Sequence, residues 1–512
     1  MAKCSPKLFG NNLECTRRLG YGGLYAEMIY NCRILNDAAG FVPVEYQGMK
    51  GLAQSQEWLH LQPGRIYEWS VVAGENVTVR VMPKFKRYVF FEGTGSRGTF
   101  SIKYNCPHCW FEVYSDGPIS YISLKPADHF HGCRRDVLDA IKEMNPRTIR
   151  LPGGIFAEKT DWKDGLKPIE ERKPILDGGK AILFCDHEGY DSHELNIDDY
   201  AAICDYVGAE MEITVRLTFS DAQDAADLVE YCNGDVTTPY GALRARRGHS
   251  EPYNVRTWYV GNEVAYVAGV GLENAIRLND EFTQAMRKVD PTIRTVVSTG
   301  NAEDWDEVFL SKAKQVDMCA QHNYIRDNIP DWEPEQLLTA AEEILYPLLK
   351  RQSVRAGGKP VLLDEWNIHW GWWGDGMSGL YAAAVLTMLI RRAEELNLYG
   401  ATYFALVNEG CIRAYTDHVT FAPDGEVMKR MTLHAGGEVV AGDDPAWVKT
   451  EHDGWNYISV YNPSVTETKP LVGAEGEYEL LTADRAEMKI TAGSGRLEQL
   501  PPLSVAFIRK MK

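Results

Sequence analysis

The sequence is short of positive charge: its 512 residues include 54 Lys plus Arg against 72 Asp plus Glu, and the formal net charge at pH 7 is −18. A phosphate backbone would meet net repulsion from such a chain rather than a basic binding surface. Anionic membrane surfaces would be repelled in the same way. We therefore expect neither nucleic acid nor a membrane as a partner.

The chain also lacks a long hydrophobic run. Its longest apolar stretch, residues 380–390, is about 11 residues long, well short of the roughly 20 needed to span a bilayer. This stretch predicts a buried helix. Residues 1–10 contain neither the apolar core nor the small-residue cleavage site of a secretory signal, and we expect the protein to stay in the cytoplasm.

Cysteine shows no disulfide framework. The 11 Cys are odd in number and scattered, which favours reduced thiols in a reducing compartment. Cys106 and Cys109 stand in a Cys-Pro-His-Cys motif, but a zinc site would need a second ligand pair, for which Cys133 with His129 or His131 is the nearby candidate. A tight turn with free thiols is the favoured interpretation, and neither a metal nor an organic cofactor is expected.

Internal repeats, low-complexity tracts and blocks of like charge are absent as well, and 45% hydrophobic with 25% charged residues is the composition of a folded globular protein. Between about residue 134 and residue 410, short β-rich runs alternate with longer amphipathic runs, which is typical of βα units around a parallel sheet. With one more strand near the N-terminus, the predicted strands are 7–10, 148–151, 212–217, 256–260, 295–298, 316–320, 360–363 and 401–406.

Eight strands of this kind close a (β/α)8 TIM barrel, so the predicted fold class is α/β. Two of the intervening segments, 135–144 and 334–346, place their apolar residues on one helical face. Pro347 should end or kink the second helix because proline lacks the N–H that the helix needs. Each face is long enough to cover a sheet.

The gap between the first two strands is far longer than a crossover connection, which indicates an insertion. Residues 40–122 show β-rich runs separated by Gly, Pro, Asn and Asp, and residues after 411 show the same pattern. At this length about three domains are expected. The predicted organisation is a first barrel strand in 1–35, an inserted β-sandwich in 36–122, the rest of the catalytic barrel in 123–410 and a C-terminal β-sandwich in 411–512.

Polar residues follow the predicted barrel strands, where the chemistry of such barrels is found. Glu263 and Glu365 end strands on opposite sides of the mouth. Two carboxyl groups about 5 Å apart across one sugar are what retaining glycoside hydrolysis needs. One must stay ionised, whereas the pKa of the other should be raised by burial and by its partner's charge. The Asn262 amide, beside Glu263, suits a hydrogen bond to a sugar hydroxyl. The Trp366 side chain, beside Glu365, suits stacking on a sugar ring.

These residues belong to a wider set of motifs whose order resembles glycoside hydrolase family 51, which consists mainly of α-L-arabinofuranosidases. The resemblance covers nearly the whole chain and implies the barrel fold and a double-displacement reaction through a covalent glycosyl-enzyme. The motifs are residues 23–33, 122–132, Arg150-Leu-Pro-Gly-Gly154, Trp162-Lys-Asp-Gly165, Gly261-Asn-Glu263, Asp364-Glu-Trp-Asn367 and Leu500-Pro-Pro-Leu-Ser-Val505.

The resemblance assigns roles to individual residues. It implies that Glu263 is the general acid/base and Glu365 the nucleophile. Glu14 matches an acidic residue that takes sugar hydroxyls, and Arg150 matches the arginine before the Pro-Gly-Gly turn. The alternative for Arg150, from its residue type alone, is a buried cation that forms an ion pair with Glu14 or Glu263.

The resemblance also matches Asn262 to the amide beside the acid/base, and His322 and Tyr324 to a His-x-Tyr pair in which Tyr324 orients the nucleophile. For His322 a packed, hydrogen-bonded core histidine is the alternative. Family members are commonly homo-oligomers, which implies the same here. The inserted sandwich resembles a carbohydrate-binding module, but Trp58, Trp69 and Trp110 are expected in its core, and no glycan binding is predicted for it.

Two positions depart from the family pattern. Ile155 stands where a polar or thiol side chain usually faces the sugar, and Ala405 stands where many members have Gln. Because a site built to hydrogen-bond a hydroxyl discriminates strongly, these changes bear on the identity of the sugar more than on the reaction.

Three hypotheses follow. The first is an exo-acting retaining α-L-arabinofuranosidase that trims arabino-oligosaccharides in the cytoplasm without a cofactor. The second keeps the mechanism but acts on a β-xyloside, a β-glucan or a galactofuranoside. The third is a non-catalytic sugar-binding barrel protein.

Overall fold

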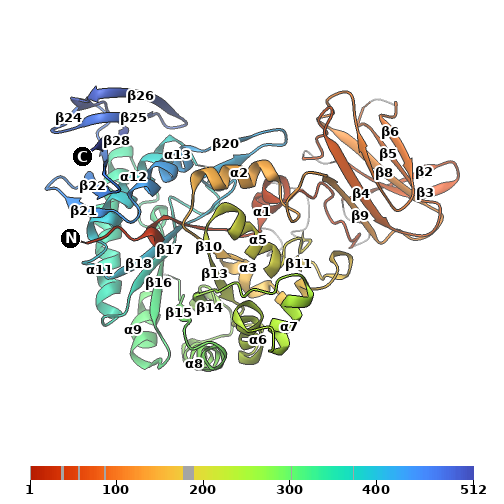
Figure 1. Ribbon diagram of the computed structural model, residues 1–512, viewed down its shortest axis with the longest axis horizontal. Helices are drawn as coiled ribbons and strands as arrows, with labels where there is room; N and C mark the ends of the chain where they lie inside the picture. The colour runs from red at the N-terminus through yellow and green to blue at the C-terminus, as the bar shows by residue number, and fades with distance from the viewer. Residues whose placement is uncertain are drawn as a thin grey trace.

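The computed structural model describes residues 2–35, 38, 40–55, 58–85, 88–176, 190–300, 302–372 and 374–512. A closed barrel of parallel strands forms its centre, with an orange β-sheet unit at one end and a blue one at the other (Figure 1). The predicted TIM barrel is confirmed. In order around the barrel, its strands are β1 (Gly10–Asn12), β10 (Thr148–Leu151), β13 (Glu210–Val215), β14 (Thr257–Val260), β15 (Arg294–Val297), β16 (Met318–Tyr324), β17 (Val361–Asn367) and β18 (Leu398–Tyr403).

Amphipathic helices surround the strands. In helix α2 (Arg135–Met144), the apolar residues Val137, Leu138, Ile141 and Met144 are buried, as the spacing predicts. Asn145 ends the helix in the left-handed conformation. The longer helices are α2 (Arg135–Met144), α5 (Ile197–Val207), α6 (Ala222–Asn233), α7 (Pro239–Arg246), α8 (Leu272–Val289), α9 (Glu303–Lys312), α10 (Pro334–Ala340), α11 (Tyr346–Arg355), α12 (Gly376–Arg392) and α13 (Pro423–Met431).

Pro347 acts as a helix interruption rather than a helix end. A π-helical turn, η6 (Ala341–Leu345), follows α10, and α11 carries Pro347 in its first turn. Proline cannot donate the backbone hydrogen bond of a regular helix, so the pattern changes before it. The chain nevertheless continues as a helix, so Pro347 does not end it, and the interruption takes the form of the π-helical turn before it.

The first barrel strand begins later than predicted. Pro6–Phe9 forms a 3₁₀ helix whose start is capped by Ser5, and the strand begins only at Gly10. Gly10 is needed because a Cβ there would lie 2.3 Å from the Thr148 hydroxyl oxygen of the neighbouring strand. The prediction of a strand at 7–10 is therefore wrong by about one turn, since Pro6 favours a helical first turn.

The inserted segment consists of a five-stranded sheet, β2-β3-β8-β5-β6, and a three-stranded sheet, β7-β4-β9. Trp69 is buried between them with Phe100 and Phe111, whereas Trp58 joins the core cluster of the barrel and Trp110 donates its indole N–H to Glu112 at 2.9 Å. The strands are β2 (Val42–Tyr46), β3 (Met49–Gln54), β4 (Ile66–Val72), β5 (Thr78–Pro83), β6 (Phe91–Thr94), β7 (Arg97–Ser101), β8 (Cys109–Ser115) and β9 (Tyr121–Pro126). Strand β9 crosses the predicted limit at residue 122.

The C-terminal part contains a six-stranded antiparallel sheet, β21-β22-β23-β28-β25-β26, beside the two-stranded β24-β27. The hairpin β19 (Ile412–Ala414) to β20 (Val419–Phe421) and helix α13 precede it and pack on the barrel helices α2 and α12, so the predicted limit at 411 falls before elements that belong with the barrel. The other strands are β21 (Glu438–Ala441), β22 (Trp447–His452), β23 (Trp455–Asn462), β24 (Lys469–Pro470), β25 (Glu475–Ala483), β26 (Met488–Arg496), β27 (Gln499–Leu500) and β28 (Ser504–Met511).

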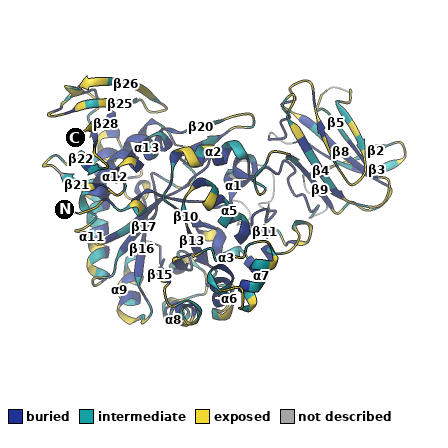
Figure 2. Cartoon of the chain, viewed as in Figure 1, coloured by how far each residue is buried: buried dark blue, intermediate teal, exposed yellow. Residues whose placement is uncertain are grey.

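Burial follows this architecture. The barrel strands carry the dark blue of buried residues, whereas exposed residues lie on the outer helices and on the far edge of the C-terminal sheet (Figure 2). The apolar stretch 380–390 is buried along α12, as predicted. Within the described residues, every helix is too short or too polar to cross a membrane.

Candidate active site

Every predicted site residue except Trp366 contributes to one cluster at the carboxyl end of the barrel strands. Barrel closure brings them together from segments far apart in the sequence. The cluster consists of Glu14 after β1, Arg150 on β10, Asn262 and Glu263 after β14, His322 and Tyr324 on β16, and Glu365 on β17.

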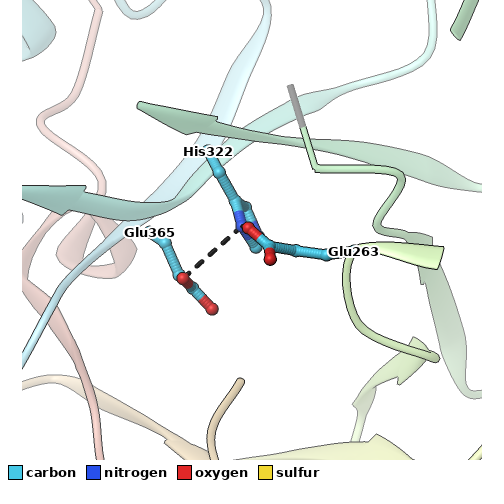
Figure 3. A group of neighbouring side chains, drawn as sticks. All are labelled: Glu263, His322 and Glu365. Carbon is cyan, nitrogen blue, oxygen red and sulfur yellow. Dashed lines mark hydrogen bonds and ion pairs between the residues drawn. The ribbon is translucent and has the colours of Figure 1, made fainter. Parts of the chain in front are cut away.

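Glu263 and Glu365 approach each other across His322 (Figure 3). One carboxylate oxygen of each lies within 4.8 Å of the other and of a ring nitrogen of His322. The turn after β14 aims Glu263 into the site: Gly261 and Glu263 both adopt positive φ, 79° and 45°. A left-handed conformation is uncommon for glutamate, and the hydrogen bond from the Glu263 N–H to the Ser298 hydroxyl, 3.4 Å, supports it.

Three donors hold the Glu365 carboxylate. The Arg150 guanidinium donates to one oxygen at 2.8 Å and the Tyr324 hydroxyl donates to the other at 2.8 Å, while the Asn12 amide lies 3.5 Å away. Arg150 is fully buried and also donates to the Asn262 side-chain oxygen at 2.5 Å. Its ion-pair partners are Glu365 and Asp364 rather than Glu14 or Glu263. Charged, fixed donors of this kind favour an ionised carboxylate.

His322 lies between the two glutamates. Its Nδ1 is 2.7 Å from Glu263 and 3.5 Å from Glu365, and its Nε2 is 3.2 Å from Asp364. Burial disfavours the imidazolium, but the charges of Asp364 and Glu365 outweigh burial and raise the pKa of His322 well above its usual value. His322 is thus buried and hydrogen-bonded, as the core-histidine alternative describes, and its hydrogen-bond partners include Glu263 of the candidate site.

The carboxyl pKa values differ from the sequence-based expectation. Burial would raise the pKa of Glu263, but the hydrogen bond and charge of His322 outweigh burial and lower it. Burial raises the pKa of Glu365, against the opposing charges of His322 and Arg150. The expectation of a raised pKa at Glu263 is wrong because a cation stands beside that carboxylate. The lowered pKa of Glu263 and the raised pKa of His322 both favour a glutamate anion beside a histidine cation.

Glu14 lies behind the Pro-Gly-Gly turn. It is buried, and its carboxylate accepts the backbone N–H of Phe156 at 2.8 Å. A Cβ at Gly154 would lie 2.8 Å from the Glu365 carboxylate and 3.4 Å from that of Glu14. Glycine is therefore required there, because any side chain would fill the space between the two carboxylates.

The prediction that Trp366 contacts the sugar is wrong. Its side chain is fully buried against Tyr403 of β18 and Tyr381 of α12, with ring centroids 4.7 Å and 6.4 Å away. Successive side chains of a strand point to opposite faces, so Glu365 faces the mouth and Trp366 faces the helices outside the barrel. Trp366 is a packing residue and does not stack on a bound sugar.

Sequence reasoning missed Glu158 and Asp364. Glu158 is buried and accepts backbone N–H groups from Leu217 at 3.1 Å, Thr218 at 2.9 Å and Asn262 at 3.1 Å. It thus ties the ends of β13 and β14 together. Asp364 could have been noticed as the acid directly before Glu365, but no local pattern marks Glu158.

Ile155 and Ala405, the two departures from the family pattern, have apolar side chains in the structure's candidate site region. Ile155 is 42% exposed at the start of the short helix α3 (Ile155–Lys159). Ala405 is fully buried in a small apolar cluster with Leu19, Tyr324 and Phe404. Neither position offers a hydrogen bond to a sugar hydroxyl.

Glu263, His322 and Glu365 are also the group of possible metal ligands found among the described residues. The Arg150 guanidinium on Glu365 and the raised pKa of His322 oppose a cation there. The alternative zinc site is not formed in the described part of the chain: Cys109 donates its thiol to the Cys106 carbonyl at 3.4 Å, and neither residue belongs to a group of three ligands.

Comparison with known proteins shows what this chain is similar to. Residues 140–337 match the alpha-L-arabinofuranosidase 1 domain. An intracellular exo-alpha-(1→5)-L-arabinofuranosidase from Acetivibrio thermocellus is 32% identical over 255 residues, which are 46% of this chain and 49% of that protein. The resemblance to the α-L-arabinofuranosidase family is confirmed. The chain spans about half the length of this and several other curated arabinofuranosidases it matches.

Other arabinofuranosidases match over more of the chain. A probable alpha-L-arabinofuranosidase C from Aspergillus clavatus is 25% identical over 437 residues, 73% of this chain and 84% of that protein. The family 51 arabinofuranosidase structure from Thermotoga petrophila covers 100% of this chain with 98% of its own, at a TM-score of 0.69 and 18% identity. An arabinose-bound family 51 arabinofuranosidase gives a TM-score of 0.79 at 17% identity, with coverage of 100% and 98%. These structures share the fold.

Proposed function

We propose that the protein is a retaining exo-glycoside hydrolase that releases terminal α-L-arabinofuranose from arabino-oligosaccharides. The separation of the two carboxylates carries this proposal. Oxygens of Glu263 and Glu365 lie within 4.8 Å of each other, close to the roughly 5 Å of retaining enzymes and below the roughly 6.5–9.5 Å that an inverting enzyme needs to admit a water.

In the first step, Glu365 attacks the anomeric carbon and the bond to the leaving oxygen breaks. Arg150 and Tyr324 hold the attacking carboxylate in place through hydrogen bonds of 2.8 Å each. His322 passes its proton to Glu263 across their 2.7 Å hydrogen bond, and Glu263 delivers it to the leaving oxygen and is left as a carboxylate. The products are a free alcohol and a glycosyl ester on Glu365.

In the second step, Glu263 takes a proton from water as the water attacks the anomeric carbon. The ester bond to Glu365 breaks, and the sugar leaves with its original configuration. Glu14 and Asn262 bind sugar hydroxyls in this proposal, and both are buried beside the carboxylates. No cofactor or metal takes part.

The proposed cellular location is supported by the names of two relatives. Curated arabinofuranosidases from Acetivibrio thermocellus and Bacillus subtilis carry the word intracellular in their names, which supports a cytoplasmic enzyme that meets imported oligosaccharides. A homo-oligomer is part of the same proposal and rests on the family resemblance.

A panel of nitrophenyl glycosides tests the sugar. Release from the α-L-arabinofuranoside should exceed release from the β-xyloside, β-glucoside and β-galactofuranoside by at least about 10²-fold in kcat/KM, because hydrogen-bonding sites discriminate strongly. Turnover of another sugar without turnover of the arabinofuranoside would favour the second hypothesis, which Ile155 and Ala405 motivate. Binding of oligosaccharides with no turnover on the whole panel would favour the non-catalytic barrel.

Replacement of Glu158 should impair the acid/base. In Glu158→Ala the N–H groups of Leu217, Thr218 and Asn262 lose a buried acceptor, and the turn that carries Glu263 shifts. We expect kcat/KM to fall about 10²-fold, more for alkyl than for nitrophenyl leaving groups, because only the former need a well-placed acid. Glu170→Ala, at an exposed position, is the control. Equal losses on both substrate classes would point to a general folding defect and contradict the positioning role.

A further inference from the structure

Three neighbouring barrel strands are each followed by an exposed apolar side chain. Ile155 follows β10, Phe219 follows β13, and Tyr266 ends the short turn η4 (Val264–Tyr266) after β14. Their exposed fractions are 42%, 66% and 59%. Because β10, β13 and β14 are adjacent in the barrel, these side chains belong to one sector of its mouth. We call Ile155, Phe219 and Tyr266 the apolar sector.

The apolar sector adjoins Glu263 rather than the far side of the mouth. Tyr266 and Glu263 both pack on Gly300, where a Cβ would lie 2.6 Å from the Tyr266 ring and 3.6 Å from the Glu263 Cβ. The loop that carries Phe219 is tied to the same turn, since Glu158 binds the N–H of Thr218, one residue before Phe219, and the N–H of Asn262. The leaving oxygen is protonated on this side.

The chemistry of the sector selects the leaving group. Ile155 and Phe219 offer neither a donor nor an acceptor, and the Tyr266 hydroxyl is the single polar side-chain group of the three. A second sugar placed against these three side chains would meet the Tyr266 hydroxyl as their single hydrogen-bonding group. A flat ring without hydroxyls would cover exposed apolar surface and lose little hydration.

We propose that the apolar sector is the binding site for the leaving group and that it prefers a flat apolar alcohol over a second sugar. The proposal rests on the proposed release of arabinofuranose and departs from it in the leaving group alone: arabinofuranosides of apolar cyclic or aromatic alcohols are preferred over arabino-oligosaccharides, whose leaving group is a second sugar. Ile155 then contributes to the recognition of the leaving group, at a position where the family pattern has a polar side chain facing the sugar.

Matched substrates test the proposal. Methyl and benzyl α-L-arabinofuranoside have alcohols of similar acidity, so their difference in kcat/KM reports on contact with the leaving group. The wild-type enzyme should cleave the benzyl glycoside about tenfold better, and Phe219→Ser and Tyr266→Ser should each reduce that ratio toward one. Phe85→Ser, at an 83% exposed aromatic residue of the inserted segment, should keep the wild-type ratio.

The possible outcomes distinguish a failure of the apolar sector from a failure of the proposed function. A wild-type ratio near one, or a ratio that both variants leave intact, overturns the apolar sector. An equal loss on α-1,5-arabinobiose in Phe219→Ser means that the sector binds the next sugar, which also overturns the proposal. If neither arabinofuranoside is cleaved, the proposed function fails, and the same pair of alcohols on whichever sugar is cleaved still tests the apolar sector.

Discussion

Glu365→Ala should lose activity on every glycoside, whereas Glu263→Ala should lose it selectively. Without Glu365 no covalent intermediate can form, and kcat should fall by about 10⁴-fold or more even for nitrophenyl substrates. Without Glu263 a good leaving group still departs, so kcat/KM for a dinitrophenyl arabinofuranoside should stay within about tenfold of wild type, while that for an alkyl glycoside falls by about 10³-fold.

Azide provides the second readout of this pair of variants. In Glu263→Ala the glycosyl ester accumulates because no base activates water, and azide should restore turnover and give a glycosyl azide of retained configuration. In Glu365→Ala azide should attack the sugar directly and give the inverted product. Glu273→Ala, whose side chain is 75% exposed in its ion pair, is the control. Near-normal turnover in Glu365→Ala, or exchanged azide products, would refute the assigned roles.

His322→Asn should shift the pH profile as well as lower the rate. In the wild-type protein the charges of Asp364 and Glu365 raise the pKa of His322 despite its burial, which favours a protonated His322 beside Glu263. In the variant that proton must be held by a carboxyl group, which titrates lower. We expect the alkaline limb of kcat/KM to move to lower pH by about one unit or more.

The same substitution predicts a pH-dependent stability difference. Because the pKa of His322 is raised on folding, its stabilising contribution is complete below the unfolded value of about 6.5 and is lost as the pH rises through the folded value. The melting-temperature difference between wild type and His322→Asn should therefore shrink as the pH increases above neutrality. His131→Asn, a half-exposed histidine paired with Asp199, is the control for the rate profile. An unchanged alkaline limb in His322→Asn would rule out the proton-holding role.

The barrel could be predicted from the sequence because its signals are local. Apolar periodicity marked α2 at its observed limits, and β-rich runs located each strand to within a few residues. The first strand was missed by one turn where Pro6 starts a 3₁₀ helix, and α13 was missed because it is a short helix among strand-like segments. Such errors arise where a local preference and a tertiary contact disagree.

The residues of the candidate site could also be predicted from the sequence only in part. The order of the motifs brought Glu263, Glu365 and their neighbours to one barrel mouth, since the fold fixes which strand ends converge. Trp366 was misplaced although its position was readable: it follows an inward-facing glutamate, and alternation along a strand turns it outward. Glu158 had no local signal, because its contacts to β13 and β14 exist only once the barrel has closed.

The sequence alone determined the fold class, the family resemblance and the identity of the two central carboxylates, because these depend on periodicity and on the order of short motifs. The tertiary structure decided the direction in which the pKa values of the site residues shift. The pKa of Glu263 is lowered and that of His322 is raised because of which charges stand within 4 Å of them in a buried site. Those distances depend on side chains from three separate strands, β14, β16 and β17, and no spacing along the chain encodes them.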